Sequence, residues 1–383
     1  MPSAWSESTL FFDGDSCFAD VISALNQAQK SIWIEVYIYE TDRLGHRIAE
    51  ALRAAAVRGV SVHLLIDAVG CFYSKASLGN IFANSGVLLS VYNPLPFSHP
   101  VSSPSVHHPR PTLFWGSLQR MFRRNHRKIV VVDDEVAWIG GMNFSESHCA
   151  EFMGEHAWRD TSLRVRGPGV ASILAAASLL WLPVFSTTRA EARNQIKRSA
   201  LKPTNPDILL NASLALRRRK NSLLLSKVRS ATKRIFITTA YFIPTRRMRA
   251  ALESAAQRGV DVRVLVPQRA DVLFMPWAAH AFFAPLLKRG VRVFEYLPRM
   301  LHAKCLLVDE WGTVGTSNLN HRSFHQDLEV DLVVTDDASM RLLYEQFGED
   351  LASSQEITEA SLSKRPVWQR LLGRLALFFK SQL

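Results

Sequence analysis

The chain repeats its own pattern, and this duplication limits which folds it can form. The stretch "ALRAAAVRGVSVHLLID" begins at Ala51, and "ALESAAQRGVDVRVLVP" begins at Ala251, 200 positions later. In both copies an amphipathic run reaches a glycine, Gly59 or Gly259, and a β-branched run follows. This pattern predicts a helix that ends near the glycine and a strand after it. A repeated sequence unit indicates a repeated structural unit.

A second matched pair lies just upstream of the first. "AQKSIWIEVYIY" ends at Tyr39 and "ATKRIFITTAYF" ends at Phe242, and each predicts a strand rich in Ile, Val and aromatic residues. Each half therefore begins with alternating helices and strands, which is typical of an α/β fold with a largely covered sheet. We predict an α/β fold made of two similar domains that arise from an internal duplication.

The boundaries of these domains follow from composition. We expect a first domain at residues 1–185, a polar linker at 186–207, a second domain at 208–355 and a carboxyl-terminal helix at 356–383. At helical spacing the last segment places Trp368 and Phe378 on one side and Arg370 and Arg374 on the other. A basic amphipathic helix with Trp and Phe suits a bilayer interface, and docking on the core is the alternative.

The third repeated pair contains the candidate catalytic residues. "HRKIVVVD" (126–133) and "HAKCLLVD" (302–309) share the order His-x-Lys, four residues, Asp. A glycine-containing turn and an asparagine follow each copy, Gly140-Gly141 with Asn143 and Gly315 with Asn318. Residues two apart on a strand point to the same face, so we expect His and Lys of each copy to share a face of a strand.

If the two halves meet around a two-fold axis, two His, two Lys and two Asn converge. That set is complementary to a phosphodiester: the ammonium and amide groups contact the non-bridging oxygens. One neutral imidazole attacks phosphorus, and the other, protonated, gives its proton to the leaving alkoxide. The scheme needs no metal and no cofactor, and we predict neither.

The charge of the chain indicates an anionic partner. Net charge is +12 and the pI is about 9.8, which suits either nucleic acid or an anionic membrane. The run "LRRRK" (216–220) contacts such phosphates or is the solvated face of a helix. Two apolar segments, 170–185 and 272–287, are shorter than the ~20 residues that cross a bilayer, so we predict no transmembrane helix.

The paired HxKxxxxD motifs with a downstream asparagine resemble the phospholipase D superfamily, and within it the short bacterial cardiolipin synthases without amino-terminal spans. The similarity runs from about Phe11 to the carboxyl end and includes "WRDTSLRV" and "DLEVDLVV". It implies two similar phospholipase-D-like α/β sandwich domains, related by a pseudo-two-fold axis with one shared active site. It also implies a phosphohistidine intermediate on one motif histidine.

The resemblance also implies a role for each matching residue. His126 is the nucleophile and His302 the acid/base, with the reverse assignment open. Lys128, Lys304, Asn143 and Asn318 bind the substrate phosphate, while Asp160 and Glu329 orient the histidines. Asp133 and Asp309 complete the catalytic motif, and we expect them to support the structure.

The function expected from this resemblance is phosphatidyl transfer at a membrane. Two phosphatidylglycerols would give cardiolipin and glycerol on a peripheral enzyme at the cytoplasmic face of the cell membrane. Its partners would be anionic phospholipid and glycerophospholipid substrates, with no obligatory protein partner evident. Hydrolysis as a phospholipase D, or cleavage of nucleic acid phosphodiesters by a nuclease of the superfamily, is the alternative. A membrane scaffold with a decayed site is opposed by the complete His-Lys-Asn sets.

Overall fold

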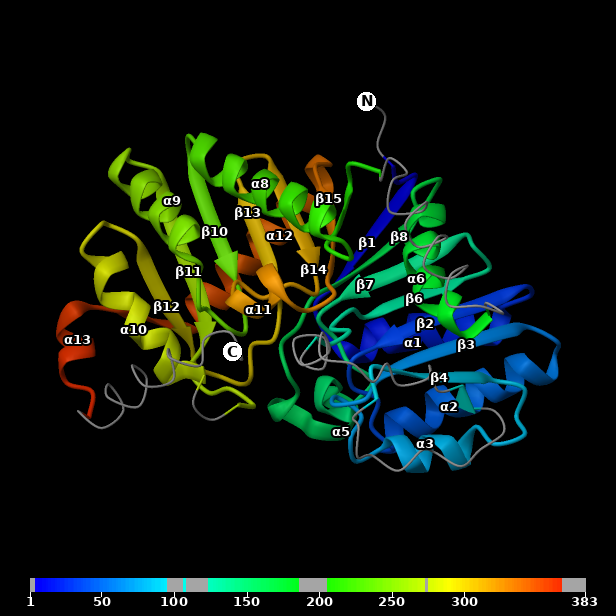
Figure 1. The fold of residues 1–383 in the computed structure, drawn as a ribbon. Helices are drawn as coiled ribbons and strands as arrows, with labels where there is room; N and C mark the ends of the chain where they lie inside the picture. The colour runs from blue at the N-terminus through cyan, green and yellow to red at the C-terminus, as the bar shows by residue number, and fades with distance from the viewer. Residues whose placement is uncertain (1–3, 95–105, 108–122, 186–204, 273–274, 367–383) are drawn as a thin grey trace, which may run out of the picture.

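The protein was analysed as a computed structural model, which describes residues 4–94, 106–107, 123–185, 205–272 and 275–366. Figure 1 shows two halves side by side, each built on a mixed sheet. The first sheet has, in spatial order, β1 (Glu7–Phe11), β8 (Ser162–Arg166), β7 (Val136–Gly140), β6 (Ile129–Val132), β2 (Ser31–Val36), β3 (Ser61–Asp67), β4 (Leu88–Tyr92) and β5 (Val106–His107).

The second sheet repeats this plan. Its order is β16 (Ser354–Ile357), β12 (Arg292–Tyr296), β11 (Asp261–Pro267), β10 (Arg234–Thr238), β13 (Cys305–Val308), β14 (Trp311–Gly315), β15 (Val330–Val334) and β9 (Ile208–Leu210). Each sheet contains a parallel set, β2-β3-β4 or β10-β11-β12, which β5 extends in the first sheet. The motif strand, β6 or β13, joins this set antiparallel. The predicted duplication is confirmed.

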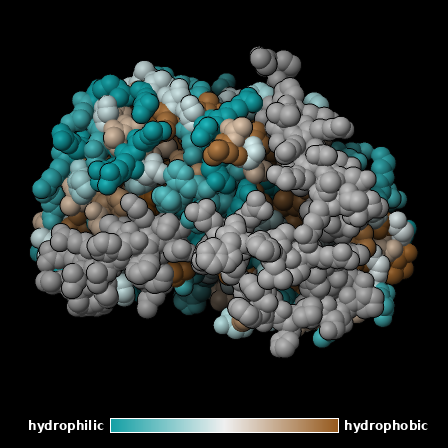
Figure 2. All heavy atoms as spheres, in the orientation of Figure 1, coloured by the Kyte–Doolittle hydropathy of each residue, from teal (hydrophilic) through white to brown (hydrophobic). Residues whose placement is uncertain are grey.

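Helices cover the sheets as the alternating pattern predicts. The first half has α1 (Gly14–Gln27), α2 (Arg43–Val57), α3 (Lys75–Ile81), η1 (Glu146–His148), α5 (Ala150–Met153), η2 (Gly154–His156) and α6 (Val170–Phe185). The second half has α8 (Leu214–Ser230), α9 (Arg246–Gln257), α10 (Met275–Leu287), α11 (His321–His325), α12 (Asp337–Ala352) and α13 (Glu359–Ser363). The outer surface over α8 and α9 is mainly hydrophilic (Figure 2).

The repeated glycines perform the same task in both halves. Gly59 follows α2 and Gly259 follows α9, and each adopts φ +89°. This left-handed conformation ends the helix and redirects the chain into β3 or β11, and a side chain at either position would be strained. The matching conformation explains why the two stretches align without a gap.

A shared core holds the halves together. Ile129, Val131 and Ile139 of the first sheet belong to one buried cluster with Leu307 and Val314 of the second. Helices α6 and α12 contribute to the same cluster through Val170, Ile173, Met340 and Leu343. At about 25 cal/mol per Å² of buried apolar surface, this continuous cluster favours one two-domain unit over two separate domains.

The starts of the motif strands and the end of the second sheet differ from the expected positions, and two expected segments lie mostly outside the described residues. The His-x-Lys segments are not within strands, because β6 begins at Ile129 and β13 at Cys305, one residue after each lysine. The second sheet continues through β16 to Ile357, past the expected domain end at 355. Most of the linker and the carboxyl-terminal helix (residues 186–204 and 367–383) lie outside the described residues.

Two apolar segments can be compared with their predicted character. The segment at 170–185 forms α6, and the other forms α10, which contains Pro285. Among the residues that the structure describes, no helix is both long and apolar enough to cross a bilayer.

Candidate active site

The two His-x-Lys segments leave their own sheets and pair with the opposite half. The amide of His126 donates to the carbonyl of Leu328 (3.0 Å), and that of His302 donates to the carbonyl of Arg159 (2.7 Å). Isolated parallel bridges, Asn125 with Leu328 and Leu301 with Arg159, extend each contact. This pairing explains why the segments are not strands of their own sheets. It brings both histidines to the boundary between the halves.

Each histidine receives a carboxylate from the other half. Nδ1 of His126 lies 3.1 Å from Oε2 of Glu329, and Nδ1 of His302 lies 2.7 Å from Oδ2 of Asp160. A carboxylate at Nδ1 accepts a hydrogen bond from the Nδ1–H group, which leaves the Nε2 lone pair available and fixes the ring orientation. Neither histidine-acid pair can therefore form within one half of the chain.

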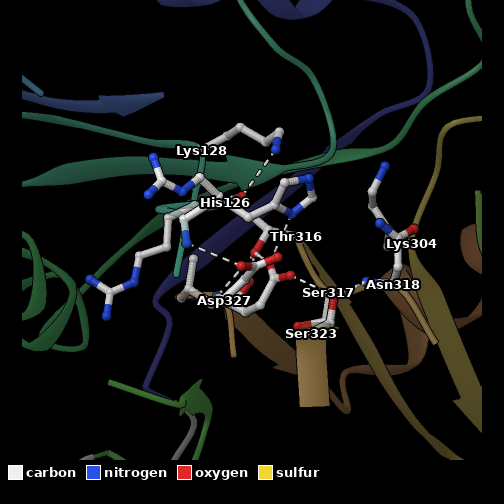
Figure 3. A network of polar contacts seen from close by, with 12 residues as sticks. His126, Lys128, Lys304, Thr316, Ser317, Asn318, Ser323 and Asp327 are labelled. Atoms are coloured by element: carbon white, nitrogen blue, oxygen red, sulfur yellow. Dashed lines mark hydrogen bonds and ion pairs between the residues drawn. The ribbon is translucent and has the colours of Figure 1, made fainter. Parts of the chain in front are cut away.

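The Glu329 pair is supported by two hydroxyl donors. Thr316 donates to Oε2 of Glu329 (2.5 Å), and Ser323 donates to Oε1 (2.6 Å). Burial raises the pKa of Glu329, but the charge and hydrogen bond of His126, with the charge of Lys220, outweigh it and hold that pKa below its usual range. Figure 3 shows His126 and Lys128 of the first half beside Thr316 and Ser323 of the second.

The Asp160 pair has different surroundings. Asp160 is fully buried and accepts from the amide of Thr161 (2.7 Å). Gly141 allows this carboxylate to lie close, because a Cβ at residue 141 would be 2.1 Å from Oδ1 of Asp160. Burial raises the pKa of Asp160, and burial with the charge of Lys304 lowers the pKa of His302 well below its ordinary value.

The two motif lysines are buried at the same place. Nζ of Lys128 donates to the carbonyl of His126 (3.0 Å), and Nζ of Lys304 donates to the carbonyl of His302. Burial and the nearby charge of Lys304 lower the pKa of Lys128 to about 7, while burial lowers that of Lys304 to about 8. Two buried cations in proximity favour an anionic ligand between them.

The two motif asparagines are buried, and their side-chain oxygens are held. Oδ1 of Asn143 accepts from the amide of Ile38 (3.3 Å), and Oδ1 of Asn318 accepts from the hydroxyl of Thr239 (3.4 Å). Because the oxygen faces its own half, the amide –NH₂ group is the donor that each residue can offer to a phosphate oxygen. Figure 3 shows Asn318 beside Lys304.

The motif aspartates lie at the other end of the motif strands from the lysines. Asp133 accepts from the amides of Gln29, Lys30 and Ser31, and Asp309 accepts from those of Thr232, Lys233 and Arg234. These contacts tie the turn after β6 or β13 to the start of β2 or β10. They fit the structural role expected of both residues, and we propose no catalytic role for them.

Some residues of the site carried no sequence signal. Tyr37 lies against His126 (5.0 Å between ring centroids) and Trp158 against His302 (5.4 Å). Lys220, part of the basic run, is buried and pairs with Asp331 at 2.7 Å, while Arg218 and Arg219 remain exposed. The solvated-face interpretation is therefore wrong for Lys220. A single aromatic residue, or one lysine in a basic run, has no spacing that distinguishes it from a surface residue.

One group of side chains has the donor set for a metal ion. His148, Asp160 and His302 are buried and offer ligand atoms within 4.8 Å of one another. Lys304 and Lys128 act on the same residues with positive charge. That charge opposes a cation, and the Nδ1 of His302 is engaged with Asp160. The chemistry of these residues therefore fits a proton-transfer group better than a metal centre.

Comparison with known proteins identifies the family. A family model described as "Cardiolipin synthase, PLD-like domain" matches residues 21–162 and 224–351, one segment in each half. The chain belongs to this family. Among its curated relatives, a cardiolipin synthase of Clostridium perfringens is 31% identical over 94% of this chain and 74% of its own length. Another, from Alkalihalophilus pseudofirmus, is 33% identical over 96% and 70%.

A solved structure supports the fold of this cardiolipin-synthase-like chain. The phosphatidylserine synthase of Haemophilus influenzae superposes with a TM-score of 0.70 over 98% of this chain and 93% of its own, at 15% identity. At that identity the similarity establishes the two-domain architecture alone.

Proposed function

We propose that this protein is a phosphatidyltransferase that makes cardiolipin and glycerol from two molecules of phosphatidylglycerol. The observation that carries the proposal is the pair of crossed histidine-acid contacts, Glu329 to His126 and Asp160 to His302, beside two buried lysines. The cardiolipin synthase family to which the chain belongs supports the substrate class.

In the first half-reaction, Nε2 of His126 attacks phosphorus, and the bond between phosphorus and the head-group glycerol oxygen breaks. His302, which takes up a proton at Nε2 when the anionic phosphate offsets the charge of Lys304, gives this proton to the departing oxygen, which leaves as glycerol. Lys128 and Lys304, with Asn143 and Asn318, stabilise charge on the non-bridging oxygens. We assign attack to His126, which the resemblance favours and whose side chain is 13% exposed compared with 4% for His302.

In the second half-reaction, His302 takes the proton from a glycerol hydroxyl of the second phosphatidylglycerol. The resulting oxygen attacks the phosphorus of the phosphohistidine, the phosphorus–nitrogen bond breaks, and cardiolipin forms with His126 regenerated. The hydrogen bond to each acid keeps a proton on Nδ1 of its histidine. Only Nε2 therefore transfers protons to the substrate or forms a bond with it. Transfer to lipid instead of water requires that water be kept from the intermediate.

The test is incubation of the purified protein with phosphatidylglycerol vesicles and analysis of the lipid products. Cardiolipin with an equal amount of glycerol supports the proposal. Phosphatidic acid as the main product would mean hydrolysis by a phospholipase D, and cleavage of single-stranded DNA without lipid turnover would identify a nuclease. We expect His126→Ala and His302→Ala each to abolish turnover, whereas the exposed His156→Ala keeps it.

The order of the two histidines can be tested separately. Phosphatidylglycerol labelled in the phosphatidyl phosphate, followed by alkaline denaturation, should leave label on the wild-type protein and none on His126→Ala. The conditions are alkaline because a phosphohistidine is lost in acid. Label that persists in His126→Ala and disappears in His302→Ala would reverse the assignment.

We further propose that the enzyme works as a peripheral protein at the cytoplasmic face of the cell membrane. Lipid substrates place it at a bilayer, and the net charge of +12 supports attraction to anionic lipid. Protease accessibility in inside-out and right-side-out vesicles distinguishes the two faces. Cleavage of the protein in intact right-side-out vesicles would contradict the cytoplasmic assignment.

A further inference from the structure

A third histidine lies inside the site and has no part in the mechanism above. His148, in η1, is buried (1% exposed), and its Nε2 accepts from the backbone amide of Asn143 at 3.1 Å. A ring nitrogen that accepts a hydrogen bond carries no proton, so the proton of the neutral ring is on Nδ1. Burial lowers the pKa of His148 to about 3, which keeps the ring neutral.

The protonated nitrogen of His148 faces the acid that orients His302. Its Nδ1 lies 3.7 Å from Oδ2 of Asp160, the same oxygen that is 2.7 Å from Nδ1 of His302. Among the described residues, this buried Nδ1 has no partner within hydrogen-bond distance. Asp160 therefore lies between two imidazoles, one at hydrogen-bond distance and one slightly beyond it.

The other half shows what this arrangement achieves. There the backbone amide of Asn318 donates to Oγ of Ser323 (3.2 Å), and Ser323 donates to Glu329 (2.6 Å). Ser323 thus links the motif asparagine to the acid. His148 lies between the matching groups of the first half, with a hydrogen bond from the amide of Asn143 and its Nδ1 3.7 Å from Asp160. The side-chain lengths compensate. The short side chain of Asp160 is next to the long side chain of His148, and the long side chain of Glu329 is next to the short side chain of Ser323.

We infer that His148 is a positioning residue: the backbone amide of Asn143 fixes its ring, and its Nδ1–H faces the Asp160 carboxylate at 3.7 Å and restricts where that carboxylate can lie. This role rests on the proposed function, since it acts on the histidine that transfers the proton. His148 does not touch the reacting atoms. It restricts the position of the Asp160 carboxylate and so keeps the proton of His302 on Nδ1 and its Nε2 free.

Kinetics of matched variants test the role. We expect His148→Ala to lower kcat by about 10- to 100-fold with KM nearly unchanged, as loss of a residue that orients a catalytic group does. His148→Asn keeps an N–H near the position of Nδ1 but has no acceptor at the position of Nε2, so it should recover part of kcat. His156→Ala, an exposed histidine of η2, is the control and should match the wild type. An unchanged kcat in His148→Ala, or an Asn variant no better than Ala, would overturn the inference.

A double variant separates action through Asp160 from general loosening of the fold. If His148 acts only through Asp160, then His148→Ala in a protein that already carries Asp160→Asn should cause less than about a two-fold further loss of kcat. Losses that multiply would contradict the inference, because they would show that His148 acts by another path. Thermal unfolding of each variant checks that it is folded at the temperature of the kinetic assay.

A readout that needs no turnover keeps the two proposals distinguishable. In protein with ¹⁵N-labelled histidine, the Nδ1 proton of His302 should give a downfield signal that disappears in His302→Gln. We expect this signal to broaden in His148→Ala and to persist in His148→Asn. An unaltered signal in His148→Ala would refute the positioning role. Absence of lipid turnover by the wild type with this result intact would refute the proposed function alone.

Discussion

At the scale of single residues, the two histidines are equivalent in sequence and unequal in environment. Asp160 is packed against Gly141 and faces His148, while Glu329 is held by Thr316 and Ser323. Burial raises the pKa of Asp160, whereas the partners of Glu329 lower its pKa. Two imidazoles that must be in different protonation states at the same moment therefore have acids of different character.

The close approach of Gly141 to Asp160 gives a matched pair of variants. Gly141→Ala places a Cβ 2.1 Å from Oδ1 of Asp160, so the carboxylate must move away from His302. We expect kcat to fall by about 10- to 100-fold. Thr316→Ala at the equivalent position removes one hydrogen bond to Glu329, and a loss of about three- to ten-fold is expected. If the two variants lose activity equally, the different surroundings of Asp160 and Glu329 do not affect catalysis.

The buried lysines predict how substrate binding depends on pH. With pKa values lowered to about 7 and about 8, Lys128 and Lys304 lose their charge in the free enzyme as pH rises through this range. Affinity for an anionic head group should therefore decrease between pH 7 and pH 9. Lys128→Arg keeps its charge at every pH of the assay and should flatten this decrease. The measurement is KM, or inhibition by inorganic phosphate, across the pH range; a KM that is constant to pH 9 in the wild type would contradict the expectation.

Part of this site is accessible to sequence reasoning and part is not. The spacing of the duplicated motif identifies His126, Lys128, His302 and Lys304, because the same residue types recur in the same order. It does not show that each acid crosses to the other half, since nothing in a linear sequence states which faces of two domains meet. His148 also carries no signal: one histidine after a motif resembles any other until Asp160 is seen beside it.

At the scale of elements, the sequence predicts helices and strands well and their ends less well. The glycines at 59 and 259 mark the ends of α2 and α9, because their positive φ values need a residue without a Cβ. The His-x-Lys segments show the opposite case. Both residues of each pair are expected on a strand, but pairing with the opposite half takes precedence, so β6 and β13 begin only at the residue after each lysine.

The motif aspartates are predicted to act on stability and not on catalysis. Asp133 and Asp309 adopt φ +54° and +50°, and each accepts from three backbone amides. Asp133→Ala should lower the free energy of unfolding by about 1–2 kcal/mol through lost hydrogen bonds and left-handed strain, with kcat within about two-fold of the wild type.

The pH dependence of that effect has a defined sign. Burial raises the pKa of Asp133, but hydrogen bonds from the amides of Lys30, Gln29 and Ser31 outweigh it and lower the pKa below its ordinary 3.8. Its contribution is therefore complete above the pKa of the unfolded chain and is lost as pH falls through the folded value. Urea unfolding at pH 7 and pH 3 should show the difference between wild type and Asp133→Ala shrink in acid. A large loss of kcat in Asp133→Ala would contradict a purely structural role and indicate that Asp133 contributes to catalysis.

At the scale of the whole molecule, the active site exists only where the two halves meet. Each histidine is oriented by the other half, and the buried cluster around Ile129 and Leu307 joins the two sheets. Duplication therefore does more than supply two copies of a motif. Under the proposed mechanism, it lets two half-sites, neither complete alone, assemble around one phosphate, with different surroundings for the nucleophile and the acid.

One ion pair between the halves allows a measurement of how far stability and activity depend on their contact. The Arg159 guanidinium contacts both carboxylate oxygens of Asp350, at 2.9 and 2.8 Å, and both side chains are about 95% buried. Asp350→Ala leaves a buried guanidinium without its carboxylate, and we expect the free energy of unfolding to fall by about 3–5 kcal/mol. Activity should fall as well, since Asp160 follows Arg159 directly and orients His302.

A double-mutant cycle separates the pair from the two residues taken singly. If the charges act on one another, Arg159→Ala together with Asp350→Ala should destabilise the protein by clearly less than the two single losses added together, because the double variant has no unpaired buried charge. Urea unfolding followed by circular dichroism measures all four proteins, with Arg164→Ala, whose partners are partly exposed, as a surface ion-pair control expected to lose about 1 kcal/mol or less. Strictly additive losses would show that the two side chains contribute to stability independently of one another.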